Sequence, residues 1–251
     1  MTDEGLRGRV ILVTGSGRGL GAAIARAAGA ERARVVVNCR HDTRSAEAVA
    51  ADVARLGGES IAVRADVSAF DEARTLVESV VARWGRIDVL VNLVGGFHWS
   101  GLVDMDPDDW RQVLASNLDS VFHMCRLTVP HMRERRFGRI VNFAAVGSGA
   151  TQGEPEMAAY SAAKAGVIAL SRSLALEEAR CGITVNVVSP GLLRDETDDR
   201  AGRSASLLGD RVPVGHPGAA EDVIRAVLFF ASPAADFVTG QVVEVAGGAR
   251  S

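Results

Sequence analysis

The sequence predicts an α/β fold in which a doubly wound parallel sheet of about seven strands carries helices on both faces. Two observations lead to this fold class. Short runs rich in β-branched residues alternate with longer helical patterns from one end of the 251-residue chain to the other. The short runs are also apolar throughout, without alternation of apolar and polar positions, as expected of strands that are buried on both faces.

Each apolar run has the length of a strand and is followed by polar or turn-forming residues. In chain order the predicted strands are Val10–Val13, Arg34–Cys39, Ser60–Ala65, Val89–Leu93, Arg139–Phe143, Thr184–Val188 and Val242–Val245.

The segments between the runs have helical patterns, and one begins clearly at Asp106 followed by Pro107, a capping side chain before a proline. Strands and helices that alternate in this way predict right-handed crossovers within a single domain over residues 1–251. The stretch 191–218 has no clear element, and loops of that length are usually functional, so we expect a substrate lid there. The predicted helices cover 19–32, 43–56, 69–84, 107–136, 158–180 and 219–231.

Composition and charge limit the functions open to the chain. A hydrophobic content of 47 % is ordinary for a globular protein, and a net charge of -3 offers nucleic acid or an anionic membrane no attraction. Cys39, Cys125 and Cys181 have neither metal-ligand spacing nor a disulfide framework, which indicates a reducing compartment. The N-terminus is charged, and no apolar run approaches the roughly 20 residues of a membrane span. We therefore expect a cytoplasmic protein without metal, membrane or nucleic-acid partners.

A glycine-rich segment joins the first predicted strand to the first predicted helix. Glycines at such a junction let the backbone turn tightly and approach a pyrophosphate, which lies at the positive end of the helix. A purely structural turn is the alternative, but the place between strand and helix favours a dinucleotide site in a Rossmann-type sheet. After Thr14, the candidate cofactor residues are Gly15, Ser16, Gly17, Arg18, Gly19, Leu20 and Gly21.

The end of the second strand bears on which dinucleotide binds. A carboxylate there would hold the ribose 2′-hydroxyl of NAD and repel the 2′-phosphate of NADP. The chain has Asn38-Cys39-Arg40 instead, and Arg18 lies inside the glycine loop. Two guanidinium groups can converge on one phosphate, although either could be solvated surface in a chain so rich in arginine. The absence of the carboxylate is the stronger indication, and we predict NADP(H).

The only tyrosine and the only lysine of the chain, Tyr160 and Lys164, are four residues apart in a predicted helix. Residues at i and i+4 share a helix face, so the ammonium group lies near the phenol. A nearby cation favours the phenolate and lowers the phenol pKa from its usual value of about 10. An ordinary amphipathic helix is the alternative. Because every other basic residue is arginine, a single lysine at this spacing favours an acid/base pair.

The glycine pattern T-G-x-x-x-G-x-G and the Y-x-x-x-K motif resemble the short-chain dehydrogenase/reductase family. The resemblance extends from Gly8 to Gly248, and the ending is similar to that of bacterial 3-oxoacyl thioester (acyl carrier protein) reductases. It implies that Tyr160 donates and accepts the proton and that Lys164 binds the nicotinamide ribose and lowers the Tyr160 pKa. It also implies that Asn117 holds a water in the proton relay.

The same resemblance implies further cofactor contacts and an oligomer. Asp66, which is followed by Val67, would contact the adenine. Because the family is commonly tetrameric and the helix 158–180 is apolar on more than one side, we expect that helix to meet a partner subunit in a homotetramer. The remaining implied contacts are Asn92 and Gly95 after the fourth strand and Pro190 and Gly191 beside the nicotinamide.

The chain departs from the family at three places. The usual N-N-A-G after the fourth strand reads Asn92-Leu93-Val94-Gly95. The catalytic serine position falls on Ala145 when it is counted forward from the fifth strand, whereas Ser148 lies 12 residues before Tyr160, close to the usual distance. Ser148 then either polarises the substrate carbonyl or is a simple turn residue between two glycines. Asp195 stands where the family often has a threonine, and Thr197 is the nearest one.

The substrate region offers only suggestive residues. Phe97, His98 and Trp99 follow the fourth strand, and Glu154 and Glu156 precede the catalytic helix, a combination that suggests a planar or nitrogen-bearing substrate. Transfer of hydride between NADP(H) and a ketone or alcohol is the leading function. An imine or pterin-like C=N reductase is the second, because that chemistry depends less on the serine. A catalytically weak NADP(H)-binding protein is the third.

Overall fold

The computed structural model describes residues 5–148, 153–194 and 212–249. Within these ranges one sheet of seven strands has the order β3-β2-β1-β4-β5-β6-β7, and every neighbouring pair is parallel. The predicted fold class is confirmed. The strands are β1 (Val10–Val13), β2 (Arg34–Cys39), β3 (Glu59–Arg64), β4 (Val89–Asn92), β5 (Gly138–Phe143), β6 (Ile183–Pro190) and β7 (Val242–Val245).

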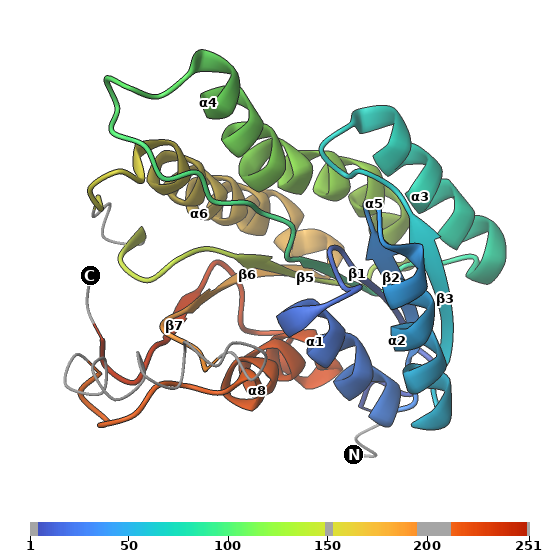
Figure 1. The fold of residues 1–251 in the computed structure, drawn as a ribbon. Coiled ribbons are helices and arrows are strands. Elements are labelled where there is room, and N and C mark those ends of the chain that lie inside the picture. The colour runs from blue at the N-terminus through green and yellow to red at the C-terminus, as the bar shows by residue number, and fades with distance from the viewer. Residues whose placement is uncertain (1–4, 149–152, 195–211, 250–251) are drawn as a thin grey trace.

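Helices cover both faces of the sheet (Figure 1). On one face lie α1 (Gly19–Ala30), α2 (Thr43–Arg55) and α8 (Ala220–Ala231). On the other lie α3 (Phe70–Trp84), α4 (Pro107–Leu114), α5 (Ser120–Arg135) and α6 (Ala158–Glu178). Short 3-10 turns follow α6 and α8, at Ala179–Cys181 and Pro233–Ala235.

Two hydrophobic cores lie between the sheet and its helices, and neighbouring residues of one strand enter different cores. Ile11 and Val13 of β1 pack in the core under α1, α2 and α8, whereas Val10 and Leu12 pack in the core under α3, α5 and α6. Successive side chains of a strand point to opposite faces, so burial on both sides requires an apolar residue at every position. This explains the unbroken apolar runs of the sequence.

The strand order places a crevice at the middle of the sheet. The chain runs outward from β1 through β2 to β3 and then returns to β4 on the other side of β1. At such a reversal the loops after two neighbouring strands diverge, and ligands bind outside the carboxyl ends of the strands.

The helix predicted near 107–136 is confirmed, with one wider turn in its middle. The segment consists of α4, a π-helical turn at Ala115–Asp119 and α5. The Asn117 side chain donates to the Val113 carbonyl at 3.0 Å, and the Ser120 hydroxyl donates to the Ser116 carbonyl at 2.6 Å. Side chains that bond to carbonyls of the preceding turn compete with the helical backbone bonds and loosen that turn. Single π turns are frequent at functional sites.

The predicted lid at 191–218 lies largely outside the described residues, as do Asp195 and Thr197. Its two ends are described and meet, because Arg194 donates its backbone N–H to the Gly218 carbonyl at 2.8 Å. None of the helices in the described ranges combines the length and apolar character needed to cross a membrane.

Candidate active site

The glycine loop turns directly from β1 into α1. Gly15 and Gly19 have φ angles of +65° and +54°, a region that glycine enters without strain. A side chain at Gly21 would lie 2.6 Å from the Gly15 carbonyl oxygen, so only glycine lets the helix pack so closely on the turn. Arg18 precedes α1 without a capping side-chain bond, and the positive end of the helix faces the loop. This is the geometry that a bound pyrophosphate requires.

Some predicted loop residues support the turn instead of lining a pocket. The Ser16 hydroxyl donates to the Val13 carbonyl at 2.7 Å and accepts from the Asn38 backbone N–H at 3.0 Å. It therefore joins the end of β1 to the end of β2 inside the protein. Leu20 packs against the core under α1.

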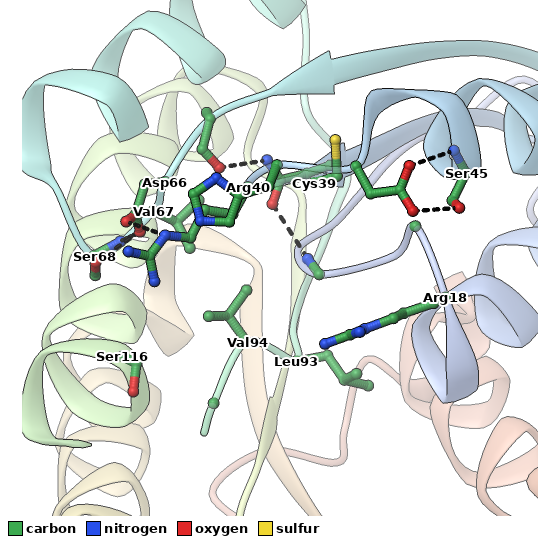
Figure 2. Close-up of a pocket in the computed structure, with 17 residues that line it drawn as sticks. Arg18, Cys39, Arg40, Ser45, Asp66, Val67, Ser68, Leu93, Val94 and Ser116 are labelled. Carbon is green, nitrogen blue, oxygen red and sulfur yellow. Dashed lines mark hydrogen bonds and ion pairs between the residues drawn. The ribbon is translucent and has the colours of Figure 1, made fainter. Parts of the chain in front are cut away.

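A cavity of about 400 Å³ opens beside the loop, between the ends of β1, β2, β3 and β4 (Figure 2). It brings together seven of the predicted cofactor residues: Gly15, Gly17, Arg18, Arg40, Asp66, Val67 and Gly95. Asn38 and Cys39, at the strand end that bears on the choice of dinucleotide, line it too, whereas Asp42, Ser45, Ser68 and Ser116 were not predicted from the sequence.

Arg40 and Asp66 form an ion pair across the cavity wall, with 2.9 Å between Nε and Oδ2 (Figure 2). Partial burial would raise the pKa of the Asp66 carboxyl, but two hydrogen bonds from Ser68 and the nearby guanidinium outweigh it and lower the pKa. Asp66 is therefore ionised and holds Arg40. Arg18 lines the same cavity (Figure 2), so both guanidiniums predicted for the 2′-phosphate lie at its wall, where Arg40 is paired with Asp66.

Asp42 brings a carboxylate to the same cavity. It precedes α2 and accepts hydrogen bonds from the backbone and the hydroxyl of Ser45, which lower its pKa together with Arg18 and Arg44. An acidic residue directly before a predicted helix is the sequence signal of an N-cap and could have revealed this residue. The wall of the cavity thus carries Arg18 and a fixed negative charge.

Asn117 lies in the π turn and is completely buried. Its amide nitrogen donates to the Gly96 carbonyl at 2.9 Å, whereas its Oδ1 has no partner in the described structure. A side chain at Gly95 would collide with this oxygen and would lie 3.4 Å from the Lys164 Nζ. Gly95 therefore lets an unpaired acceptor and a lysine approach the same point. Buried polar atoms normally have partners, so the free acceptor indicates a site for a bound donor.

Tyr160 and Lys164 share one face of α6, as the spacing predicts. The Lys164 ammonium is buried, donates to the Phe143 carbonyl at 3.0 Å and lies 5.4 Å from the centroid of the Tyr160 ring. Burial raises the pKa of Tyr160 to about 12 and lowers the pKa of Lys164 to about 8. The expected decrease of the Tyr160 pKa is thus wrong for this structure, because burial dominates and the ammonium is directed to a carbonyl.

One aromatic side chain lies against the Tyr160 ring, and a second lies against the first. The ring centroids of Phe97 and Tyr160 are 4.3 Å apart, and those of Phe97 and Trp99 are 6.5 Å apart. His98 points elsewhere and pairs with Asp109, with 3.4 Å between Nε2 and Oδ2. This contact supports the interpretation of His98 as a loop residue without a catalytic role.

Ser148 is buried at the end of a turn after β5, and its backbone N–H donates to the Ala145 carbonyl at 3.1 Å. Gly147 donates its N–H to a carboxylate oxygen of Glu244 on β7, at 3.0 Å. The turn that carries Ser148 is therefore attached to the far strand of the sheet, a connection that the sequence did not predict.

Asn92 occupies a different place from the one predicted. Its amide donates to the Asn142 Oδ1 at 2.8 Å, and Asn142 donates to the Ser171 hydroxyl at 2.8 Å. The side chain is buried between β4 and β5 and does not line the cavity, because it points toward the core under α5 and α6. Asn92 thus stabilises the sheet beneath the site.

Pro190 and Gly191 lie at the end of β6. The Gly191 N–H donates to the Val245 carbonyl at 3.0 Å, and a side chain there would lie 2.7 Å from the Ala246 Cβ. The preceding Ser189 has a buried hydroxyl without a partner in the described residues. The strand end that the resemblance assigns to the nicotinamide therefore has an unused polar group.

Comparisons with known proteins found relatives that match nearly the whole chain. The family model described as enoyl-(acyl carrier protein) reductase matches residues 15–250. A 3-oxoacyl-[acyl-carrier-protein] reductase of Synechocystis is 39 % identical over 244 residues, 97 % of each chain. One of Staphylococcus aureus is 38 % identical over 238 residues, 94 % of this chain and 96 % of the relative.

Two solved structures are similar over nearly the whole chain. One, from Sinorhizobium meliloti, is provisionally described as a short-chain alcohol dehydrogenase. It has a TM-score of 0.91 at 28 % identity, and the match covers 98 % of both chains. A gluconate 5-dehydrogenase from Burkholderia cenocepacia, in complex with NADP and tartrate, has a TM-score of 0.88 at 33 % identity. It covers 98 % of this chain and 96 % of that chain.

Proposed function

The chain belongs to the short-chain dehydrogenase/reductase family, and we propose that it is a ketoreductase that transfers a hydride between NADP(H) and a carbonyl compound or secondary alcohol. The observation that carries this proposal is the convergence of Asn117, Gly95 and Lys164 beside Tyr160. These residues come from three separate segments of the chain and meet at the carboxyl edge of the sheet, where such folds bind ligands.

The residues present fit a dinucleotide. The positive end of α1 and the glycine turn suit the pyrophosphate, and the cavity bounded by Arg40, Asp66 and Val67 suits the adenosine half. The unpaired Asn117 Oδ1 and the Lys164 Nζ lie where the nicotinamide half would end. When bound, NADP(H) supplies or accepts the hydride.

Tyr160 is the proton donor for reduction. Hydride addition leaves negative charge on the substrate oxygen, which requires a proton from a positioned acid. Burial raises the pKa of the Tyr160 phenol, so at neutral pH it carries the proton that the substrate oxygen requires. The Lys164 ammonium then lies close enough to the ring to stabilise the phenolate that forms. Asn117 can bind a water through its free oxygen and so return a proton to the site.

The relatives favour a ketone as the substrate. The two curated relatives reported above are described as 3-oxoacyl reductases, whose substrates carry a ketone. Nothing in the comparisons supports C=N reduction or a catalytically weak binding protein.

The experiment is a substrate screen with the purified chain. NADPH consumption is followed with simple ketones, 3-oxoacyl thioesters and cyclic imines, each in parallel with the Tyr160→Phe variant as a control. We expect consumption with ketones that the variant lacks. Consumption with imines alone, or binding of NADPH without turnover of any carbonyl compound, would contradict the ketoreductase assignment.

Three finer statements are part of the proposal. NADP(H) is preferred over NAD(H), which Arg18, Arg40 and the NADP bound by the gluconate 5-dehydrogenase support. The protein acts in the cytoplasm, since Cys39 and Cys125 are buried free thiols, typical of a reducing compartment. It forms a homotetramer, and the exposed Phe122 and Leu176 on α5 and α6 support a subunit contact there. Light scattering of the purified protein measures the assembly.

A further inference from the structure

Two exposed aromatic side chains, Phe97 and Trp99, follow one another beside the catalytic phenol. The Phe97 ring lies against the Tyr160 ring at 4.3 Å and 32°, and the Trp99 ring is nearly parallel to the Phe97 ring, at 15°. Phe97 and Trp99 are 61 % and 63 % exposed. A large apolar surface that is exposed beside a reacting group usually has a binding role.

A backbone hydrogen bond holds the segment that carries these rings. Phe97 and Trp99 are two residues apart in a stretch without helix or strand, and their ring centroids are 6.5 Å apart. The next residue, Ser100, donates its N–H to the Glu156 carbonyl at 3.0 Å. Glu156 has a φ of +62°, an unfavourable value for a residue with a side chain. The hydrogen bond thus attaches the aromatic segment to the stretch that leads into α6 and Tyr160.

We propose that Phe97 and Trp99 form an aromatic platform on which a flat aromatic ring attached to the substrate carbonyl stacks. This inference depends on the ketoreductase function proposed above. The two ring planes differ by only 15° and both side chains are exposed, so a flat ring can lie against their faces. A puckered saturated ring makes fewer contacts with such faces. Because Phe97 also contacts the Tyr160 ring, a carbonyl attached to the stacked ring lies near the phenol.

Charge at the entrance narrows the substrate class further. Glu154 and Glu156 are exposed on the segment that is bonded to the aromatic loop, and Asp104 is exposed at the end of that loop. Carboxylates at a site entrance repel an anionic substrate. The substrate class is therefore a neutral or cationic aryl ketone.

The test compares acetophenone with cyclohexyl methyl ketone, two ketones of equal carbon skeleton that differ in ring planarity. We expect kcat/KM of the wild type to be at least about tenfold higher for acetophenone, since a flat ring stacks on the aromatic faces and a puckered ring does not. Trp99→Leu and Phe97→Leu should each reduce this ratio to about threefold or less, mainly through KM. Leu102→Ala is the matched control, because Leu102 is exposed on the same loop outside the ring stack. It should leave the ratio unchanged.

A second measurement does not depend on turnover. Calorimetric titration of acetophenone into protein saturated with NADP⁺ should show binding in the wild type and a loss of about tenfold in Trp99→Leu. Equal kcat/KM for the two ketones in the wild type, or an acetophenone affinity that Trp99→Leu leaves unchanged, overturns the aromatic platform while the ketoreductase assignment stands. Absence of turnover with every carbonyl compound overturns that assignment instead.

Discussion

The cofactor side and the substrate side of the site are built in different ways. On the cofactor side, side chains at the ends of β1, β2 and β3 bond to one another: Ser16 to β2, Asn38 to the Ala65 carbonyl, and Arg40 to Asp66. On the substrate side, the large side chains of the loop after β4 are exposed, and one backbone bond from Ser100 attaches that loop to the segment before α6.

This difference indicates that substrate specificity can change without loss of stability of the fold. A buried polar group that loses its partner destabilises the protein, so the bonded cofactor side tolerates little change. Exposed aromatic side chains cost little to replace, so the substrate side can be altered freely. We therefore expect variants on the two sides to separate cofactor binding from substrate selection.

The largest expected effect is at the residue between the two sides. Tyr160→Phe should reduce kcat by about 10³-fold or more, because the proton donor is lost, while the aromatic contact with Phe97 is retained. The NADPH dissociation constant, measured by fluorescence titration, should stay within about twofold. Substantial turnover by this variant would mean that the proton comes from another group.

Ser148 tests whether the substrate side supplies a hydrogen-bond donor to the carbonyl. If it does, Ser148→Ala should lower kcat by about 10²–10³-fold, the usual loss for one such donor, with unchanged NADPH affinity. Ala145→Ser, at the position that the forward alignment favours, is the companion variant. Near-full activity of Ser148→Ala would assign Ser148 to the turn alone.

The buried charge of Lys164 should lower the free energy of unfolding of the protein, although the residue has a role in the site. Its pKa falls from 10.5 to about 8 on folding, so below pH 8 the folded protein bears the full cost of a buried charge, and above pH 10.5 that cost disappears. Lys164→Met should therefore raise the free energy of unfolding at pH 7 by roughly 3 kcal/mol. Urea unfolding at a series of pH values should show this advantage shrinking between pH 8 and 10.5. A constant difference across that range would contradict the depressed pKa.

Arg40 tests the preference of the cofactor side. The wild type should bind NADPH about tenfold more tightly than NADH, and Arg40→Ala should remove most of that preference, because its guanidinium is one of the two cations at the cavity. Fluorescence titrations with both cofactors measure it. Arg44→Ala, on the exposed first turn of α2 and outside the cavity lining, is the control. Equal affinities in the wild type would make the proposed NADP(H) preference wrong.

The smallest expected effect is at Asp42, whose carboxylate opposes Arg18 in the same cavity. Asp42→Asn keeps a side chain that can cap α2 and removes one negative charge, so NADPH should bind about threefold more tightly and NADH about as before. A melting temperature close to that of the wild type confirms that the cap is preserved. Equal gains for both cofactors would contradict an effect on the 2′-phosphate.

Local patterns predicted most of what is local. The three strands Val10–Val13, Arg34–Cys39 and Val242–Val245 agree with the structure residue by residue. β1 is fully buried, as its unbroken apolar run predicts, whereas β7 lies at the sheet edge and is only partly buried. The glycine turn and the shared helix face of Tyr160 and Lys164 could likewise be predicted, because each depends only on residues that are close in sequence.

Tertiary structure decided what depends on distant residues. The partner of Arg40, the inward position of Asn92 and the aromatic contact between Phe97 and Tyr160 join segments that only the folded sheet brings together. The pKa values followed the same rule: proximity in sequence predicted a more acidic phenol, whereas burial raised its pKa. Desolvation depends on everything that packs around a group, and no local pattern of residues records it.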